Sequence, residues 1–146
     1  MLKSDKPEIH ISNHHSKFRP PVTNSTITEL VCVINKREWI NLKKIDINYL
    51  DDKNLKKLNK QFLNHNYNTD ILTFDYSKKG LPNEAELLLS LDRIKKNAEF
   101  YNTSYKQEFK RVLIHGMLHL AGYNDSTLKE QELIRNKENF YLSKFT

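Results

Sequence analysis

Apolar residues recur along the chain with two different spacings, and the shorter spacing predicts strands. In two segments apolar residues alternate with polar ones, which is typical of half-buried strands. Two other segments are compact β-rich or apolar runs, which are typical of buried strands. The four predicted strands cover residues 7–14, 44–50, 69–76 and 84–91. Gly80 and Pro82 lie between the last two strands and predict a turn there.

The longer period, with apolar residues at i, i+3, i+4 and i+7, predicts helices in most of the remaining chain. The predicted helices cover residues 23–39, 51–63, 91–101, 104–123 and 126–145. Thr26 and Glu29 have the spacing of a capping box in the first helix, and Asp51 or Asp52 can cap the second. The order of elements predicts a single α/β (α+β) domain over residues 1–146, with a mixed sheet of about four strands and about five helices.

Length and composition fit one globular domain. At 146 residues the chain can bury one hydrophobic core and is short for two. No segment resembles a membrane span, and the segment MLKSDKPEIHISNHH lacks the apolar run of a secretory signal, so we expect a cytoplasmic protein. The only cysteine, Cys32, is expected to be a buried free thiol. These patterns indicate no particular oligomeric state.

The balance of charge favours an anionic partner. Lysine and arginine number 24 against 18 acidic residues, a net charge of +6, and nucleic acid is the leading class of partner for such a chain. Lys56, Lys57 and Lys60 lie on the polar side of the predicted helix 51–63 and are candidates for contacts with RNA phosphates. The alternative is a solvated lysine-rich surface. Three histidines near the N-terminus lack ligand spacing and are expected on strand or loop surface: His10, His14 and His15.

The segment HGMLHLAGYND, residues 115–125, contains the candidate metal-binding residues. His115 and His119 are four residues apart on a predicted helix, so both imidazoles project from the same side of it. Gly122 follows at a distance suited to a left-handed residue that ends a helix, and the returning chain brings Asp125 toward the two histidines. This pattern predicts a metal site with His115, His119 and Asp125 as ligands. Gly116, inside the helix, indicates close packing against the sheet.

Three protein ligands with a fourth position open are typical of catalytic zinc, which lowers the pKa of bound water to about 7. The predicted chemistry is therefore hydrolysis, with the metal-bound water as the reactive group. The spacing also matches zinc peptidases, whose general base is a glutamate directly after the first histidine. Here that position is Gly116, so peptidase activity is the weaker hypothesis, and the basic surface favours cleavage of a phosphodiester.

At these residues the chain resembles the YbeY family of bacterial endoribonucleases, whose signature is H-G-x-L-H-L-x-G-Y-D-H. Two further segments, LNKQFLNHNYNTDILTF and EAELLLSLDRIKKNA, are similar to other family segments in the same order. The resemblance implies an α/β domain with a zinc-bearing cleft and one zinc ion per chain. It also implies hydrolysis of single-stranded RNA, a role in 16S rRNA maturation and ribosome quality control, and rRNA and the small ribosomal subunit as partners.

The chain departs from the family pattern at two positions that bear on activity. The third family histidine falls on Asp125. Its charge offsets part of the charge of a bound metal, and an oxygen ligand favours a harder metal more than a third histidine does. The family arginine aligns with Leu63, which cannot bind a phosphate. Lys60 or His65 lies close enough in sequence to substitute for it.

Two further residues are candidates for supporting roles in catalysis. His65 can act as an acid or base, or be an ordinary loop residue. Asp70 can orient a ligand histidine or cap a turn. Because the leucine replaces the family arginine, a second hypothesis is a non-catalytic ribosome-associated factor that binds RNA and uses the metal to hold its C-terminal turn.

Overall fold

A four-stranded sheet forms the centre of the computed structural model, which describes residues 6–81 and 83–145. Pro82, part of the predicted turn, lies outside the described residues. The strands are β1 (Glu8–Asn13), β2 (Lys44–Leu50), β3 (Ile71–Asp75) and β4 (Glu84–Ser90), in the spatial order β1-β2-β4-β3. The pairs β1–β2 and β2–β4 are parallel and β3–β4 is antiparallel. The predicted mixed sheet is confirmed.

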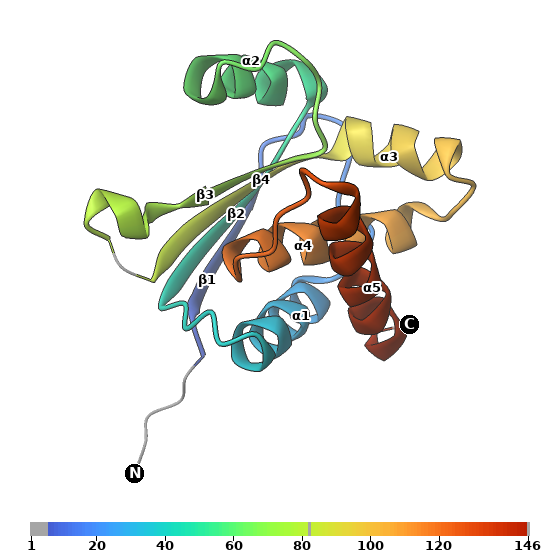
Figure 1. The fold of residues 1–146 in the computed structure, drawn as a ribbon. Coiled ribbons are helices and arrows are strands. Elements are labelled where there is room, and N and C mark those ends of the chain that lie inside the picture. Colours follow the sequence, from blue (N-terminus) through green and yellow to red (C-terminus); the bar gives the residue numbers. More distant parts are fainter. Residues whose placement is uncertain (1–5, 82, 146) are drawn as a thin grey trace.

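Five α-helices connect and cover the strands within the described part of the chain. They are α1 (Asn24–Arg37), α2 (Asp52–Leu63), α3 (Leu91–Phe100), α4 (Tyr105–Leu120) and α5 (Leu128–Lys144), with a short 3-10 helix at Tyr76–Lys79. Figure 1 shows α2 apart from the other four helices, which gather on the opposite side of the sheet. The predicted α/β class, with about five helices, is therefore confirmed.

The alternation of side chains along β4 explains these two layers. Leu87 and Leu89 belong to the main core beneath α1 and α4, whereas Leu88 packs with Leu55 of α2 on the other face, as the two-residue period of a strand requires. Phe62, at the end of the apolar side of α2, is 57% exposed. No helix in residues 6–81 and 83–145 is long and apolar enough to cross a membrane.

The start of α1 differs from the prediction. The N-cap is Thr23, whose hydroxyl accepts a hydrogen bond from the backbone N–H of Thr26, so Thr26 lies inside the first turn and the predicted Thr26–Glu29 capping box is wrong. With Thr23 as the cap, Val22 before it and Ile27 in the next turn pack against the same core, an arrangement that fixes the entry of the chain into a helix. Asp51 caps α2 as expected.

The side chain of Cys32, expected to be buried, is only half-buried. Burial still raises the pKa of its thiol, and the charge of a nearby lysine offsets only part of this rise. The expectation failed because Cys32 lies beside the apolar stripe of α1, next to the fully buried Val31, and neighbouring residues on a helix face different directions.

Close contact with the sheet sets the position of α4, the helix that carries His115 and His119. A Cβ atom at Gly116 would lie 2.5 Å from Cδ1 of Ile71 and 3.2 Å from Cδ2 of Leu87, closer than carbon atoms normally pack. Glycine therefore lets α4 approach β3 and β4. This confirms the packing role predicted for Gly116, and it brings the histidines beside it to the edge of β3.

Candidate metal centre

Helix α4 presents His115 and His119 from its flank. Ser104 caps the helix, and the apolar stripe with Phe109, Leu113 and Met117 is buried in the core. The two imidazoles lie one turn apart beside this stripe and are about three-quarters buried, with 26% and 27% of their side-chain surface exposed. Burial of the stripe therefore fixes the side of α4 from which both rings project.

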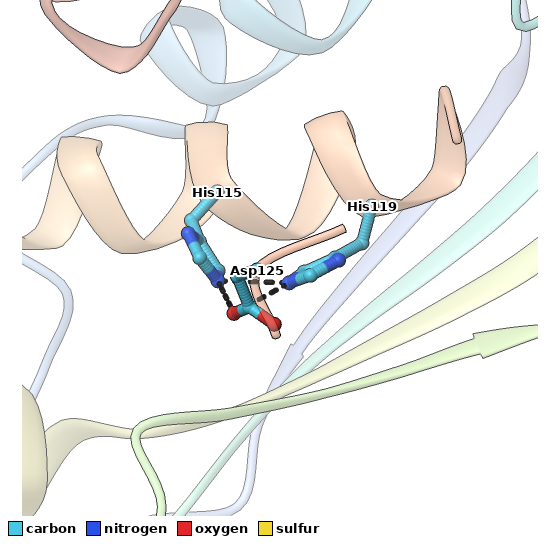
Figure 2. Close-up of side chains that lie close together, drawn as sticks. All are labelled: His115, His119 and Asp125. Atoms are coloured by element: carbon cyan, nitrogen blue, oxygen red, sulfur yellow. Dashed lines mark hydrogen bonds and ion pairs between the residues drawn. The ribbon is translucent and has the colours of Figure 1, made fainter. Parts of the chain in front are cut away.

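A left-handed glycine brings Asp125 to the same point. Helix α4 ends at Leu120, and Gly122 follows with φ of 102°, a conformation that only glycine adopts without strain. The chain then folds back, and Oδ2 of Asp125 lies 3.3 Å from Nε2 of His115 and 3.3 Å from Nε2 of His119. Figure 2 shows the two imidazoles pointing from α4 toward the aspartate between them.

The hydrogen bonds of the outer ring nitrogens define the protonation of this group. Nδ1 of His119 lies 2.9 Å from the carbonyl oxygen of Tyr123, and a carbonyl only accepts, so this nitrogen carries a proton. Nδ1 of His115 lies 2.7 Å from Oε2 of Glu138, which is again an acceptor. In the neutral rings, both Nε2 atoms therefore turn a lone pair toward each other across 2.9 Å, beside a carboxylate oxygen.

Converging lone pairs beside a carboxylate fit a small cation. Ligand atoms about 2.0–2.1 Å from a tetrahedral ion lie about 3.3 Å from one another, close to the separations found here. His115, His119 and Asp125 form a group of possible metal ligands whose ligand atoms all lie within 4.8 Å of one another. Two imidazoles and one carboxylate suit zinc and also other divalent transition metals. The predicted trio is thus brought together.

Glu138 on α5 contacts the candidate site, and the sequence analysis missed it. It is 3% exposed, and its second oxygen lies 3.1 Å from Nη1 of Arg111. Burial alone would raise the pKa of Glu138, but the hydrogen bonds and charges of His115 and Arg111 lower it below the ordinary value. Burial alone would lower the pKa of His115, but the hydrogen bond and charge of Glu138, together with the charges of Asp70 and Asp125, raise it. Glu138 therefore fixes the orientation and the tautomer of one ligand ring.

A signal for Glu138 was present in the sequence. Ile134, Glu138 and Leu142 are spaced by four residues on one side of α5, and all three are buried. A carboxylate within an apolar stripe must find a hydrogen-bonding partner inside the protein. The sequence indicates that such a partner exists, but the partner itself depends on how α5 packs against α4.

Asp70 lies at the site without touching a ligand ring. Its carboxylate accepts a hydrogen bond from the side-chain amide of Asn97 at 3.3 Å, and burial raises its pKa although the nearby His115 opposes this. The outer nitrogens of both ligand histidines are taken by Glu138 and the carbonyl of Tyr123. The orienting role considered for Asp70 is therefore filled by other groups.

Two hollows meet at Asp70, His115 and Asp125. The first, named here the α3–α5 cavity, is lined by residues of α3, α4 and α5, with a volume of about 570 Å³. The second, the β3 hollow, has a volume of about 440 Å³ and is lined by β3, the loop before it, Leu63 and both ligand histidines. Both hollows therefore open onto the candidate metal ligands His115 and Asp125.

The remaining candidates lie in three different places. Leu63, at the position of the family arginine, lines the β3 hollow beside the histidines. His65 is exposed and lines neither hollow; its ring stacks on Tyr67 and its Nδ1 lies 3.0 Å from the tyrosine hydroxyl. The α2 lysines lie on the helix that covers the opposite face of the sheet, with Lys57 and Lys60 exposed and Lys56 half-buried.

The N-terminal histidines lie away from the centre, and one of them is not at the surface. The side chain of His15 is only 4% exposed, and its Nε2 lies 2.9 Å from a carboxylate oxygen of Asp92. The expectation of a surface position was wrong for His15, because its ring contacts Asp92 on α3 and stacks on Phe18. His10 pairs with Glu8 on the exposed side of β1.

Comparison with known proteins agrees with this geometry. The family model described as Endoribonuclease YbeY matches residues 8–146. An Endoribonuclease YbeY from Cytophaga hutchinsonii is 42% identical over 110 residues, which are 75% of this chain and 77% of that protein. A second, from Chlorobium phaeobacteroides, is 36% identical over 131 residues, which are 90% of this chain and 92% of that protein.

A solved structure shows the same fold. The solution structure of TM1509 from Thermotoga maritima superimposes with a TM-score of 0.63 and 25% sequence identity, over 92% of this chain and 86% of the other. The match of the family model spans all five helices and all four strands. The chain therefore belongs to the Endoribonuclease YbeY family.

Proposed function

We propose that the protein is a zinc-dependent endoribonuclease that cleaves single-stranded RNA in the cytoplasm, during maturation of the 16S rRNA of the small ribosomal subunit. The observation that carries this proposal is the pair of Nε2 lone pairs that converge, with Oδ2 of Asp125, on one point between two hollows. Membership of a family named for endoribonuclease activity identifies the class of substrate.

The residues of the chain have distinct parts in this proposal. His115, His119 and Asp125 hold one zinc ion per chain, which when bound lowers the pKa of a water molecule to about 7. Glu138 and the carbonyl of Tyr123 keep the two imidazoles in the tautomer that binds a metal. A phosphodiester placed across the two hollows would lie against the ion.

The net charge of +6 supports an RNA substrate through attraction to its phosphates. Lys56, Lys57 and Lys60 remain candidates for RNA contacts remote from the metal centre. Substituting Lys57 and Lys60 together with alanine should weaken RNA binding and reduce its dependence on salt. The substitutions should leave metal content unchanged.

Cleavage of a labelled single-stranded RNA tests the activity. His119→Ala should abolish cleavage, because one of three ligands is lost, whereas His10→Ala should cleave like the wild type, because His10 lies on the exposed side of β1. Equal cleavage by the His119→Ala variant would show that the activity comes from another site or another protein.

One observation favours a second function, that of a non-catalytic RNA-binding factor. Leu63 lines the β3 hollow together with the two histidines, at the position where the family pattern has an arginine able to bind a phosphate. RNA binding that weakens steeply with salt, without any cleaved product, would support this second function over the first.

A further inference from the structure

The α3–α5 cavity lies beside the candidate metal ligands and is partly open to solvent. Its volume of about 570 Å³ lies within the range of pockets that hold small molecules, and it has room for one nucleotide. His115 and Asp125 form part of its wall, so whatever occupies it lies next to the metal ligands. The rest of the wall comes from α3, α4 and α5, and its polar groups determine what can bind.

Glu108 is the acceptor in this cavity that has no partner. It lies on α4 two turns before His115, lines the cavity and is only 4% exposed. Within residues 6–81 and 83–145, its carboxylate forms no hydrogen bond or ion pair. The other acidic groups of the wall differ, because Glu138 bonds His115 and Arg111, and Asp70 accepts from Asn97.

The surroundings of Glu108 are charged but do not neutralise it by contact. Burial raises the pKa of Glu108 to about 7, and the charges of Asp70 and Glu138 act in the same direction. Arg111 and Arg135 oppose them from a distance, since both guanidinium groups are paired with Glu138. Because no hydrogen bond or ion pair of the described residues engages the carboxylate and it lines the cavity, it is available to a ligand with N–H donors.

An aromatic ring lines the same cavity as this acceptor. Tyr101, just after α3, lines the cavity and is 62% exposed. Exposed aromatic rings stack on unpaired nucleobases, whatever the base. The cavity therefore combines a stacking surface with a buried acceptor, which are the two elements by which proteins recognise an extruded base.

We propose that the α3–α5 cavity receives one unpaired nucleobase adjacent to the scissile phosphodiester, and that Glu108 accepts its N–H donors, so that guanine is favoured and uracil disfavoured. Guanine carries two adjacent donors, N1–H and N2–H, which match the two oxygens of a carboxylate. The single N3–H of uracil lies between two carbonyl oxygens, which a carboxylate repels. This inference rests on the proposed RNA cleavage for its biological use.

The cavity also accounts for the proposed preference for single strands. A base inside a duplex presents its donors to its partner, and it must leave the stack before it can enter the cavity. An unpaired nucleotide can reach Glu108 without the free-energy cost of unpairing and unstacking. Base binding in the cavity therefore favours unpaired over paired RNA.

Nucleotide binding tests the inference without any cleavage step. Guanosine and uridine monophosphates are titrated into the full-length protein, and the amide shifts of α3 and α4 are followed by ¹⁵N-resolved NMR. The wild type should bind the guanosine nucleotide about tenfold more tightly, and Glu108→Gln should remove this difference, because an amide places a donor against the donors of guanine. The control Glu132→Gln, an exposed site on α5, should retain it.

A second variant tests the inference independently in case Glu108→Gln does not fold. Tyr101→Ala changes an exposed side chain and should weaken binding of both nucleotides by a similar factor, about tenfold. Equal binding of the two nucleotides by the wild type, or an unchanged preference in folded Glu108→Gln, would overturn the inference. Shifts confined to residues outside the cavity would overturn it as well.

Cleavage of RNAs that differ in one base separates this inference from the proposed function. In the wild type, kcat/KM should fall about tenfold when guanine is replaced by uracil at one position flanking the cleaved bond, and Glu108→Gln should cleave both RNAs equally. Cleavage that ignores the base at every flanking position contradicts the base-reading cavity and leaves the nuclease intact. Guanosine selectivity in the NMR titration without any RNA cleavage contradicts the nuclease and leaves the cavity intact.

Discussion

Replacing Glu138 with glutamine should weaken zinc binding about ten- to a hundredfold. The carboxylate accepts from Nδ1 of His115 at 2.7 Å, and this hydrogen bond orients the ring and increases the electron density at the metal-facing nitrogen. Glutamine keeps the shape but not the charge, and losing such a partner weakens metal affinity by about 1.4–2.8 kcal/mol. Arg111, 3.1 Å from the other oxygen, also loses its counter-ion.

Competition with a fluorescent zinc chelator at fixed pH measures the affinity. Thermal unfolding of the zinc-free proteins establishes that the variant is folded, and Glu132→Gln, an exposed position on the same helix, serves as the matched control. A folded Glu138→Gln variant that binds zinc as tightly as the wild type would refute the role assigned to Glu138. Equal weakening of zinc binding in both variants would show that the effect is not specific to the hydrogen bond between Glu138 and His115.

Three further predictions concern other residues. Gly116→Ala should lower the free energy of unfolding by up to about 2 kcal/mol in urea titrations, because overpacking against Ile71 costs about 1–3 kcal/mol and the gain in helix propensity is about 1 kcal/mol; a more stable variant would contradict this. The pKa of Glu108 rises from 4.5 to about 7 on folding, so its contribution to stability is complete below pH 4.5 and is lost as pH rises through 7. Glu108→Gln should therefore gain about 1–2 kcal/mol relative to the wild type between pH 5 and pH 8, after allowance for solvent screening, and parallel stability profiles would exclude this. Leu63→Arg should increase the rate of RNA cleavage, because it places a cation in the β3 hollow; a slower variant would show that the hollow requires an apolar side chain.

Much of the fold could be predicted because its signals are local. The alternation in β2 and the helical period of α4 follow from which residues face the core. The start of α1 was misplaced because two threonines, Thr23 and Thr26, precede the same apolar stripe. The true capping box of α5, Thr127 with Glu130, has an equally clear signature, so such signals identify a helix start only when a single candidate is present.

The proximity of the three candidate ligands could be predicted from the sequence, but the groups that support them could not. His115, His119 and Asp125 lie within eleven residues, and a single helix end fixes their relation. Glu138 reaches the site from another helix. The cavity at Glu108 likewise depends on several elements, because α3, α4 and α5 form it together. Contacts between elements distant in sequence depend on packing that no local pattern encodes.

The metal content of the freshly purified protein tests the central claim most directly. Elemental analysis by mass spectrometry should find one zinc ion per chain in the wild type and in the control His10→Ala. It should find strongly reduced zinc in Asp125→Ala, because the carboxylate oxygen lies 3.3 Å from both Nε2 atoms. Wild-type protein without stoichiometric metal, together with unchanged metal content in Asp125→Ala, would contradict the three-ligand centre.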